Sequence, residues 1–185
     1  MAGNNLIERL KDPLQKRMAF HELVITYQER LYWHIRKIII DHNDTDDILQ
    51  NVFLKVWNNI ETFREESVLS TWIYKIATNE SLTFLSQQKK RKGFFIKSED
   101  EYLKEKFYAD EFFDGEEMHK QLMEAVLSLP DKQRIVFNMK YFDEMKYEEI
   151  SDILETSVGA LKASYHHAVK KIEESIQKII DDSII

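Results

Sequence analysis

Apolar side chains recur at three- and four-residue steps through most of this 185-residue chain. Such spacing lines one face of an α-helix, whereas a half-buried strand would alternate apolar and polar residues. The chain also holds only 4 Gly and 2 Pro, fewer than the turns of a β-rich fold usually require. We therefore expect an all-α fold.

The first long helix is predicted over about 14–41. Its apolar face consists of Phe20, Leu23, Val24, Tyr27, Leu31, Ile35 and Ile38. A second helix should run to about Ile60, with Asp44 as its N-cap and with Asp46 and Asp47 in the first turn, where the helix dipole favours negative charge. Its buried stripe is Ile48, Leu49, Val52, Phe53, Val56, Trp57 and Ile60.

A loop at 63–67 separates this helix from a third one, which Ser67 is expected to cap. The third helix should end in the basic run near Gly93. Its apolar face is Leu69, Trp72, Ile73, Ile76 and Ala77. These three helices would form one small domain, residues 1–96.

Charge is distributed unevenly along the chain. The formal net charge of −7 argues mildly against nucleic-acid binding. However, residues 89–97 carry five basic side chains and no acid, while residues 99–117 carry nine acids against two lysines. The acidic segment 97–117 shows no sustained helical period, so we expect it to be a linker.

A second helical domain is predicted over 118–185. It begins with a short helix through Leu122 and Val126, and Pro130 is suited to the first position of the next helix. A helix over 147–154, a break at 155–157 and a long helix to about Ile180 follow. A short helix, a three-residue turn and a long helix describe a helix-turn-helix.

The long last helix has two different faces. Its buried face would hold Val158, Leu161, Tyr165, Ala168, Val169, Ile172, Ile176 and Ile179. Ser157 would cap it, and its opposite face carries Gly159, Lys162, Ala163, His166 and Lys170. Small and basic groups at this end suit a recognition helix in the major groove. The alternative is an ordinary helical hairpin with a solvated polar face.

Two further surfaces stand out in the N-terminal domain. Leu54 lies among polar residues on the outward face of the second helix, with Asp47, Gln50, Asn51 and Asn58. This arrangement suits a docking patch with an apolar centre, although single exposed leucines are common. The third helix combines aromatic residues with a basic end, which suits unpaired DNA. We expect Trp72 in the core, and Tyr74 and Asn79 as better candidates for base contact.

These segments together resemble the sigma-70 family of RNA polymerase sigma factors. Residues 44–57 (DTDDILQNVFLKVW) are similar to the polymerase-docking region, 63–79 to the −10 element region, and 129–172 to the −35 element domain. Only these two domains are present, as in the extracytoplasmic-function group. The resemblance spans about 20–178, and three motifs in this order make it specific.

The resemblance implies an alternative sigma factor that binds core RNA polymerase through the β′ clamp and β flap, directs promoter DNA recognition and melting, and meets an anti-sigma factor. Polymerase contacts would be Asp47, Gln50, Asn51 and Leu54. Contacts near the −10 element, where a base is flipped out, would be Phe63, Arg64, Ser67, Tyr74, Asn79, Lys89, Lys90, Arg91 and Lys92. Contacts near the −35 element would be Ser157, Lys162, Ala163, His166, His167 and Lys170.

Two departures from the family pattern carry consequences. Glu155 stands in the helix-turn-helix turn where Gly is common, and a left-handed conformation there would cost about 1 kcal/mol. His166 and His167 stand where arginine is usual. A neutral imidazole neutralises no phosphate, so promoter affinity should depend on pH near about 6.5.

Other classes of function remain open at this point. The chain has no Cys, begins without a signal peptide pattern and contains no apolar run long enough to span a bilayer, so we expect a cytoplasmic protein. A helix-turn-helix regulator with an unrelated sensing domain would explain the second domain equally well. An enzyme is not expected, because no histidine pair has metal-hydrolase spacing and no phosphate loop appears. No cofactor or metal is implied.

Overall fold

A computed structural model describes residues 2–63, 68–92, 106–107 and 117–183. Most of these residues are helical, with no strand among them, which confirms the predicted all-α class. They fall into two compact units, Met1–Gln87 and Gln88–Ile185. The predicted acidic linker, 97–117, lies almost wholly outside the described residues. No helix in the described part of the chain is long and apolar enough to cross a membrane.

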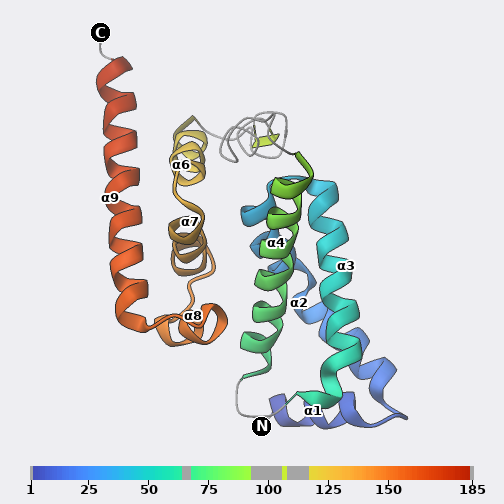
Figure 1. The fold of residues 1–185 in the computed structure, drawn as a ribbon. Helices are drawn as coiled ribbons and strands as arrows, with labels where there is room; N and C mark the ends of the chain where they lie inside the picture. Colours follow the sequence, from blue (N-terminus) through green and yellow to red (C-terminus); the bar gives the residue numbers. More distant parts are fainter. Residues whose placement is uncertain (1, 64–67, 93–105, 108–116, 184–185) are drawn as a thin grey trace. The chain divides into compact units, whose positions relative to one another are not determined.

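The first unit contains α1, α2, α3 and most of α4. Their bounds are Ala2–Lys11, Lys16–Ile39, His42–Asn59 and Leu69–Lys92, and the short 3-10 helix η1 covers Ile60–Thr62. Figure 1 shows α2, α3 and α4 side by side, with α1 across one end. The predicted apolar stripes meet in one core, which includes Leu23, Ile35, Val52, Val56 and Ile73.

Helix α1 was not anticipated from the sequence. Its Ile7 and Leu10 are buried against the core, and Arg9 Nη1 pairs with Glu22 Oε2 at 2.8 Å. The chain then turns at Asp12, whose Oδ1 accepts the backbone N–H of Leu14 at 2.9 Å. This bond, together with one from Gln15, holds the pKa of Asp12 below its ordinary value. The turn delays the start of α2 to Lys16, two residues later than predicted.

The joint between α2 and α3 is tight and strained. Ile40 adopts φ 69°, an outlier for a β-branched residue, and its N–H donates to the carbonyl of Arg36 at 2.8 Å. The side chain of Ile40 is fully buried, so packing offsets this strain. Asp41 then caps α3, with its carboxylate accepting the N–H of Asp44. The prediction that Asp44 is the N-cap was therefore wrong by one turn.

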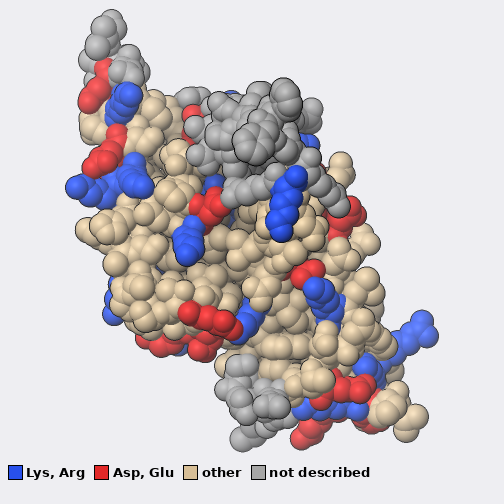
Figure 2. All heavy atoms as spheres, in the orientation of Figure 1, with Lys and Arg blue, Asp and Glu red and all other residues tan. Residues whose placement is uncertain are grey.

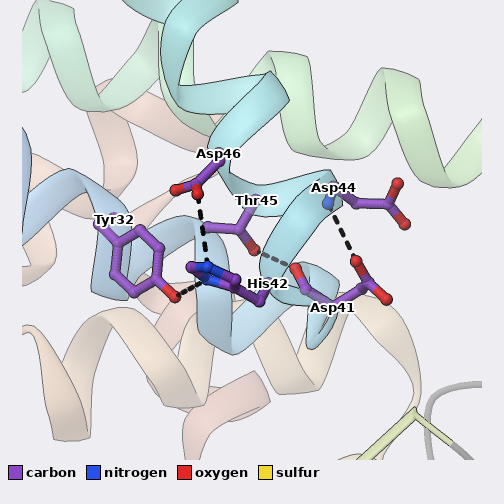
Figure 3. A network of polar contacts seen from close by, with 6 residues as sticks. All are labelled: Tyr32, Asp41, His42, Asp44, Thr45 and Asp46. Atoms are coloured by element: carbon purple, nitrogen blue, oxygen red, sulfur yellow. Dashed lines mark hydrogen bonds and ion pairs between the residues drawn. The ribbon is translucent and has the colours of Figure 1, made fainter. Parts of the chain in front are cut away.

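A polar network surrounds this joint (Figure 3). The ring of His42 lies between the hydroxyl of Tyr32, at 2.8 Å from Nδ1, and the carboxylate of Asp46, at 3.5 Å from Nε2. The hydroxyl of Thr45 donates to the carbonyl of Asp41 at 2.6 Å. Burial lowers the pKa of Arg36, while Tyr32 and the carboxylates of this network act in the opposite direction. The network connects α2, through Tyr32, with the first turns of α3.

The second unit is built around α9. Helices α6 (Glu117–Leu127), α7 (Asp131–Phe137) and α8 (Tyr147–Leu154) all contact α9 (Val158–Ser183), and a π-helical turn, η4 (Asn138–Phe142), extends α7. Figure 1 shows α9 alongside α6 and α7, with α8 at the end where α9 begins. The core includes Val126, Leu129, Phe137, Ala168 and Ile172. Pro130 is the N-cap of α7 and precedes its first residue, one position earlier than expected.

Candidate docking and nucleic-acid interfaces

The outward face of α3 is confirmed as a solvent-exposed surface. Leu54 is 59% exposed, and Asp47, Gln50, Asn51 and Asn58 around it are exposed as well. The opposite face of α3 is packed into the core through Ile48, Val52 and Val56. The helix therefore presents one large apolar side chain within a polar rim on a rigid support, which is the anatomy of a small protein-docking surface.

An ion pair ties this face to the next helix. Lys55 Nζ pairs with Glu80 Oε1, linking α3 to α4. Lys55 follows Leu54 and Glu80 follows Asn79 in the chain, so the pair joins the neighbours of two candidate contact residues. Sequence reasoning missed this pair, since the two charges are 25 residues apart.

The aromatic residues of α4 are placed between core and surface. The ring of Trp72 lies 5.2 Å from that of Phe63, which is only 4% exposed, and both belong to the core of the first unit. The expectation that Trp72 packs in the core is confirmed. Tyr74 is half-buried against the same core, and Asn79 is exposed. Of the candidate base contacts on this helix, Asn79 is thus the most accessible.

A buried polar chain supports Tyr74 from inside. The ring of His34 lies 5.0 Å from the ring of Tyr74, and its Nε2 is 3.0 Å from the hydroxyl of Thr78. That hydroxyl donates its single proton to the carbonyl of Tyr74 at 2.8 Å. Its oxygen therefore accepts from His34, so Nε2 of the ring carries a proton. The sequence did not predict that His34, on the buried face of α2, would pair with Thr78 of α4, 44 residues away.

Part of the predicted −10 surface lies outside the described residues. This holds for Arg64 and Ser67 in the loop, including the predicted cap of α4 by Ser67. The backbone of the basic run belongs to the end of α4, and Lys90 is exposed. The side chains of Lys89, Arg91 and Lys92 lie outside the described part of the structure.

The helix-turn-helix is confirmed, with α8, a turn at 155–157 and α9 at the predicted places. Glu155 has φ 51° and ψ 41°, the left-handed conformation that glycine would adopt more easily. Ser157 Oγ accepts the N–H of Ala160 at 3.3 Å, as expected of an N-cap. All the predicted contact residues here are exposed: Ser157, Lys162, Ala163, His166, His167 and Lys170.

The inner side of α9 is aromatic. Tyr165 stacks on Phe137, with ring centroids 5.8 Å apart, and also contacts Tyr147. Burial raises the pKa of Tyr165, and the neighbouring Tyr147 and Tyr141 raise it further. The phenol therefore stays neutral and holds α9 against α7 through packing. Within the described ranges, no group of His, Asp and Glu side chains is arranged to hold a metal ion.

Comparison with known proteins finds two family models that match successive parts of the chain. The family model described as Sigma-70 region 2 matches residues 23–91, and the one described as Sigma-70, region 4 matches residues 119–172. The first match covers most of α2, all of α3 and nearly all of α4, which excludes a regulator whose N-terminal domain is unrelated to sigma factors. Together the two matches cover well over half of the chain.

Relatives align along nearly the whole length. The chain is 26% identical over 171 residues to the ECF RNA polymerase sigma factor SigW of Bacillus subtilis (strain 168), covering 87% of this chain and 90% of that protein. It is 28% identical over 183 residues to the ECF RNA polymerase sigma-E factor of Escherichia coli (strain K12), covering 95% and 94%.

Solved structures share the fold. CnrH, in complex with the cytosolic domain of CnrY, superposes with a TM-score of 0.69 at 18% identity, covering 96% of this chain and 99% of that chain. The sigma factor RpoE of Bartonella quintana, in complex with the anti-sigma factor NepR, gives 0.66 at 21% identity, covering 85% and 96%. With two sigma regions in order on two helical units, the chain belongs to the sigma-70 family, in its extracytoplasmic-function group, and is an alternative sigma factor that directs promoter recognition and transcription initiation.

Proposed function

We propose that the outward face of α3 docks on the clamp coiled coil of the polymerase β′ subunit. The observation that carries this proposal is Leu54, 59% exposed at the centre of a polar helix face whose other side is packed. Asp47, Gln50 and Asn51 would supply the polar rim. Apolar anchors at the centre of an interface usually contribute most of its binding energy.

Binding to core RNA polymerase tests this assignment. We expect Leu54→Asp to abolish tight binding, because a carboxylate would be desolvated at the contact centre. Gln50→Ala/Asn51→Ala should weaken binding, because it removes two groups of the polar rim. Leu14→Asp is the matched control, since Leu14 is 93% exposed in the same unit but lies between α1 and α2. If Leu14→Asp reduced binding as much as Leu54→Asp, the docking face would be wrongly placed.

We further propose that α4 and the loop before it hold an unpaired base of the −10 element. Asn79 supports this assignment because it is exposed on the helix that continues from the loop. Tyr74, Arg64 and Ser67 would line the same pocket. Phe63 is buried, so we assign it to the support of the pocket rather than to base contact. Lys89, Lys90, Arg91 and Lys92 would meet nearby phosphates.

Promoter opening by the holoenzyme tests this part. Asn79→Ala should reduce open-complex formation while leaving polymerase binding intact. Thr83→Ala is the control, because Thr83 is exposed one helical turn further along the same helix. Equal open-complex yields for the two variants would contradict the role of Asn79.

The exposed start of α9 is the proposed −35 reader. The residues assigned to this role are all exposed, and they lie at the N-terminus of α9 or in its first half: Ser157, Lys162, Ala163, His166, His167 and Lys170. The N-terminal residues of a recognition helix usually meet base edges and phosphates. Substituting Ala163 by Glu should weaken promoter binding, because it places a carboxylate against the DNA. Glu173→Ala, on an exposed site further along α9, serves as its control.

Partners and location complete the proposal. The two solved relatives were captured with CnrY and NepR, and we propose that an anti-sigma factor also binds this chain. We place its action with cytoplasmic RNA polymerase, as an initiation factor rather than a catalyst. Residues 1–96 and 118–185 would act as separate domains, with 97–117 as an acidic linker. Limited proteolysis that cut first within 97–117 would support this division.

A further inference from the structure

Two lysines from different elements share one aromatic ring in the second unit. Lys140 Nζ, in η4, lies 5.1 Å from the centroid of the Tyr147 ring, and Lys162 Nζ, in α9, lies 5.7 Å from it. Tyr147 is the first residue of α8. Both distances are within the range of cation–π attraction. The ring therefore connects three elements: η4, which precedes the helix-turn-helix, the first helix α8 and the recognition helix α9.

In the part of the chain that the structure describes, neither ammonium group of this lysine pair meets a carboxylate. Lys140 donates to the backbone carbonyl of Met145 at 3.0 Å. Glu149, in the first turn of α8, instead accepts the backbone N–H of Lys146 at 2.8 Å. Two like charges held near one ring repel each other, and an anion that approached both would be attracted.

The surroundings restrict which anion can approach. Acidic side chains gather over α8 (Figure 2), where Glu148, Asp152 and Glu155 are exposed. These carboxylates repel a polyanion from that side. Lys162 is exposed, and it lies one turn after the Ser157 cap, beside Ala163 on α9. A DNA strand that meets the recognition helix would therefore lie close to this lysine.

We propose that Tyr147 is a positioning residue for promoter binding, whose ring holds Lys140 and Lys162 against neighbouring phosphates of one DNA strand. The inference rests on the proposed function of α9 as the DNA-facing helix. Phosphate contacts fix register and orientation without reading sequence. Lys140 and Tyr147 would thus set how the recognition helix enters the groove, while the exposed residues of α9 read it.

The test uses the full chain and a mixed-sequence DNA duplex, because a phosphate contact does not need a promoter sequence. Affinity is measured by fluorescence anisotropy over a range of salt concentrations. Lys140→Met and Lys162→Met should each reduce the slope of log affinity against log salt by up to about 0.9, the value for one phosphate contact. Tyr147→Leu should weaken binding about two- to fivefold through loss of the cation–π contacts, while Tyr147→Phe keeps the ring and the affinity.

Combining the substitutions separates positioning from a structural role. In the Lys140→Met/Lys162→Met background, Tyr147→Leu should have no further effect. An equal loss in both backgrounds would overturn the positioning role, and leave Lys162 as a DNA contact. Unchanged salt slopes for both lysine variants would overturn the phosphate site, as would an unsubstituted chain that binds no duplex at low salt.

A folding defect is excluded by thermal denaturation of each variant. If Tyr147→Leu does not fold, Tyr147→Met takes its place in both backgrounds, because it also removes the ring, and the salt slopes of the two lysine variants still decide the phosphate site. Among the described residues, His166 makes no hydrogen bond or ring contact with Tyr147 or its two lysines, so His166→Ala tests the recognition helix alone. Loss of binding in His166→Ala with intact slopes in the lysine variants would retain the −35 assignment and reject this one.

Discussion

The backbone N–H of Asp44 donates to the carboxylate of Asp41 at 3.0 Å, which makes Asp41 the N-cap of α3. The cap follows directly on Ile40, the strained residue that ends α2. Helix α3 therefore starts at a point fixed by one carboxylate. Because α3 carries the proposed polymerase contacts, its register depends on this cap.

Asp41→Ala should lower the free energy of unfolding by about 1 kcal/mol, the usual cost of losing an N-cap acceptor. Urea denaturation of the full chain measures it. Asp47→Ala is the control, because Asp47 is exposed in the same helix and makes no cap bond. A loss for Asp47→Ala as large as for Asp41→Ala would show that helix charge, rather than the cap, is responsible.

Glu155→Gly should stabilise the protein by up to about 1 kcal/mol, because a left-handed conformation carries a cost that glycine avoids. The control is Asp152→Gly, which makes the same kind of replacement in the helical part of α8. There glycine should destabilise by about 1 kcal/mol. Thermal denaturation measures both variants. A gain of stability for Glu155→Gly with a loss for Asp152→Gly would confirm the conformational cause, and a loss of stability in both variants would reject it.

Thr78→Val should destabilise the first unit by about 1–3 kcal/mol, because it leaves the Nε2–H of the buried His34 without its acceptor. Ser81→Ala removes another buried hydroxyl of α4, whose single hydrogen bond among the described residues goes to the carbonyl of Ala77 at 2.9 Å. We expect a smaller effect from this control. Chemical denaturation of both variants distinguishes a lost partner for His34 from the general cost of altering α4.

Much of the fold followed from side-chain spacing. The stripe that ends in Ile35 and Ile38 predicted α2, and the break at 155–157 predicted the helix-turn-helix to the residue. The exposure of Leu54 followed in the same way, because an apolar residue outside the buried stripe must face outward. Helix α1 was missed although Leu6, Ile7 and Leu10 have helical spacing, since a ten-residue helix shows too few periods to stand out.

The tertiary structure decided features that the spacing of residues along the chain does not predict, such as the cap of α3 and the burial of Phe63. Asp44 has the right residue type for a cap, but Asp41 caps α3 because the buried Ile40 ends α2 in a conformation that no sequence rule assigns to isoleucine. Phe63 belongs to a loop by sequence and to the core by contact.

The pairing of Lys140 and Lys162 on Tyr147 was equally invisible in the sequence, since three elements must pack before their side chains meet. The sequence by itself thus determined the longer helices, most of their buried faces, the family and the surfaces that face solvent. The tertiary structure decided which side chains act together, because cation–π contacts, buried hydrogen bonds and caps depend on distances between segments that periodicity leaves free.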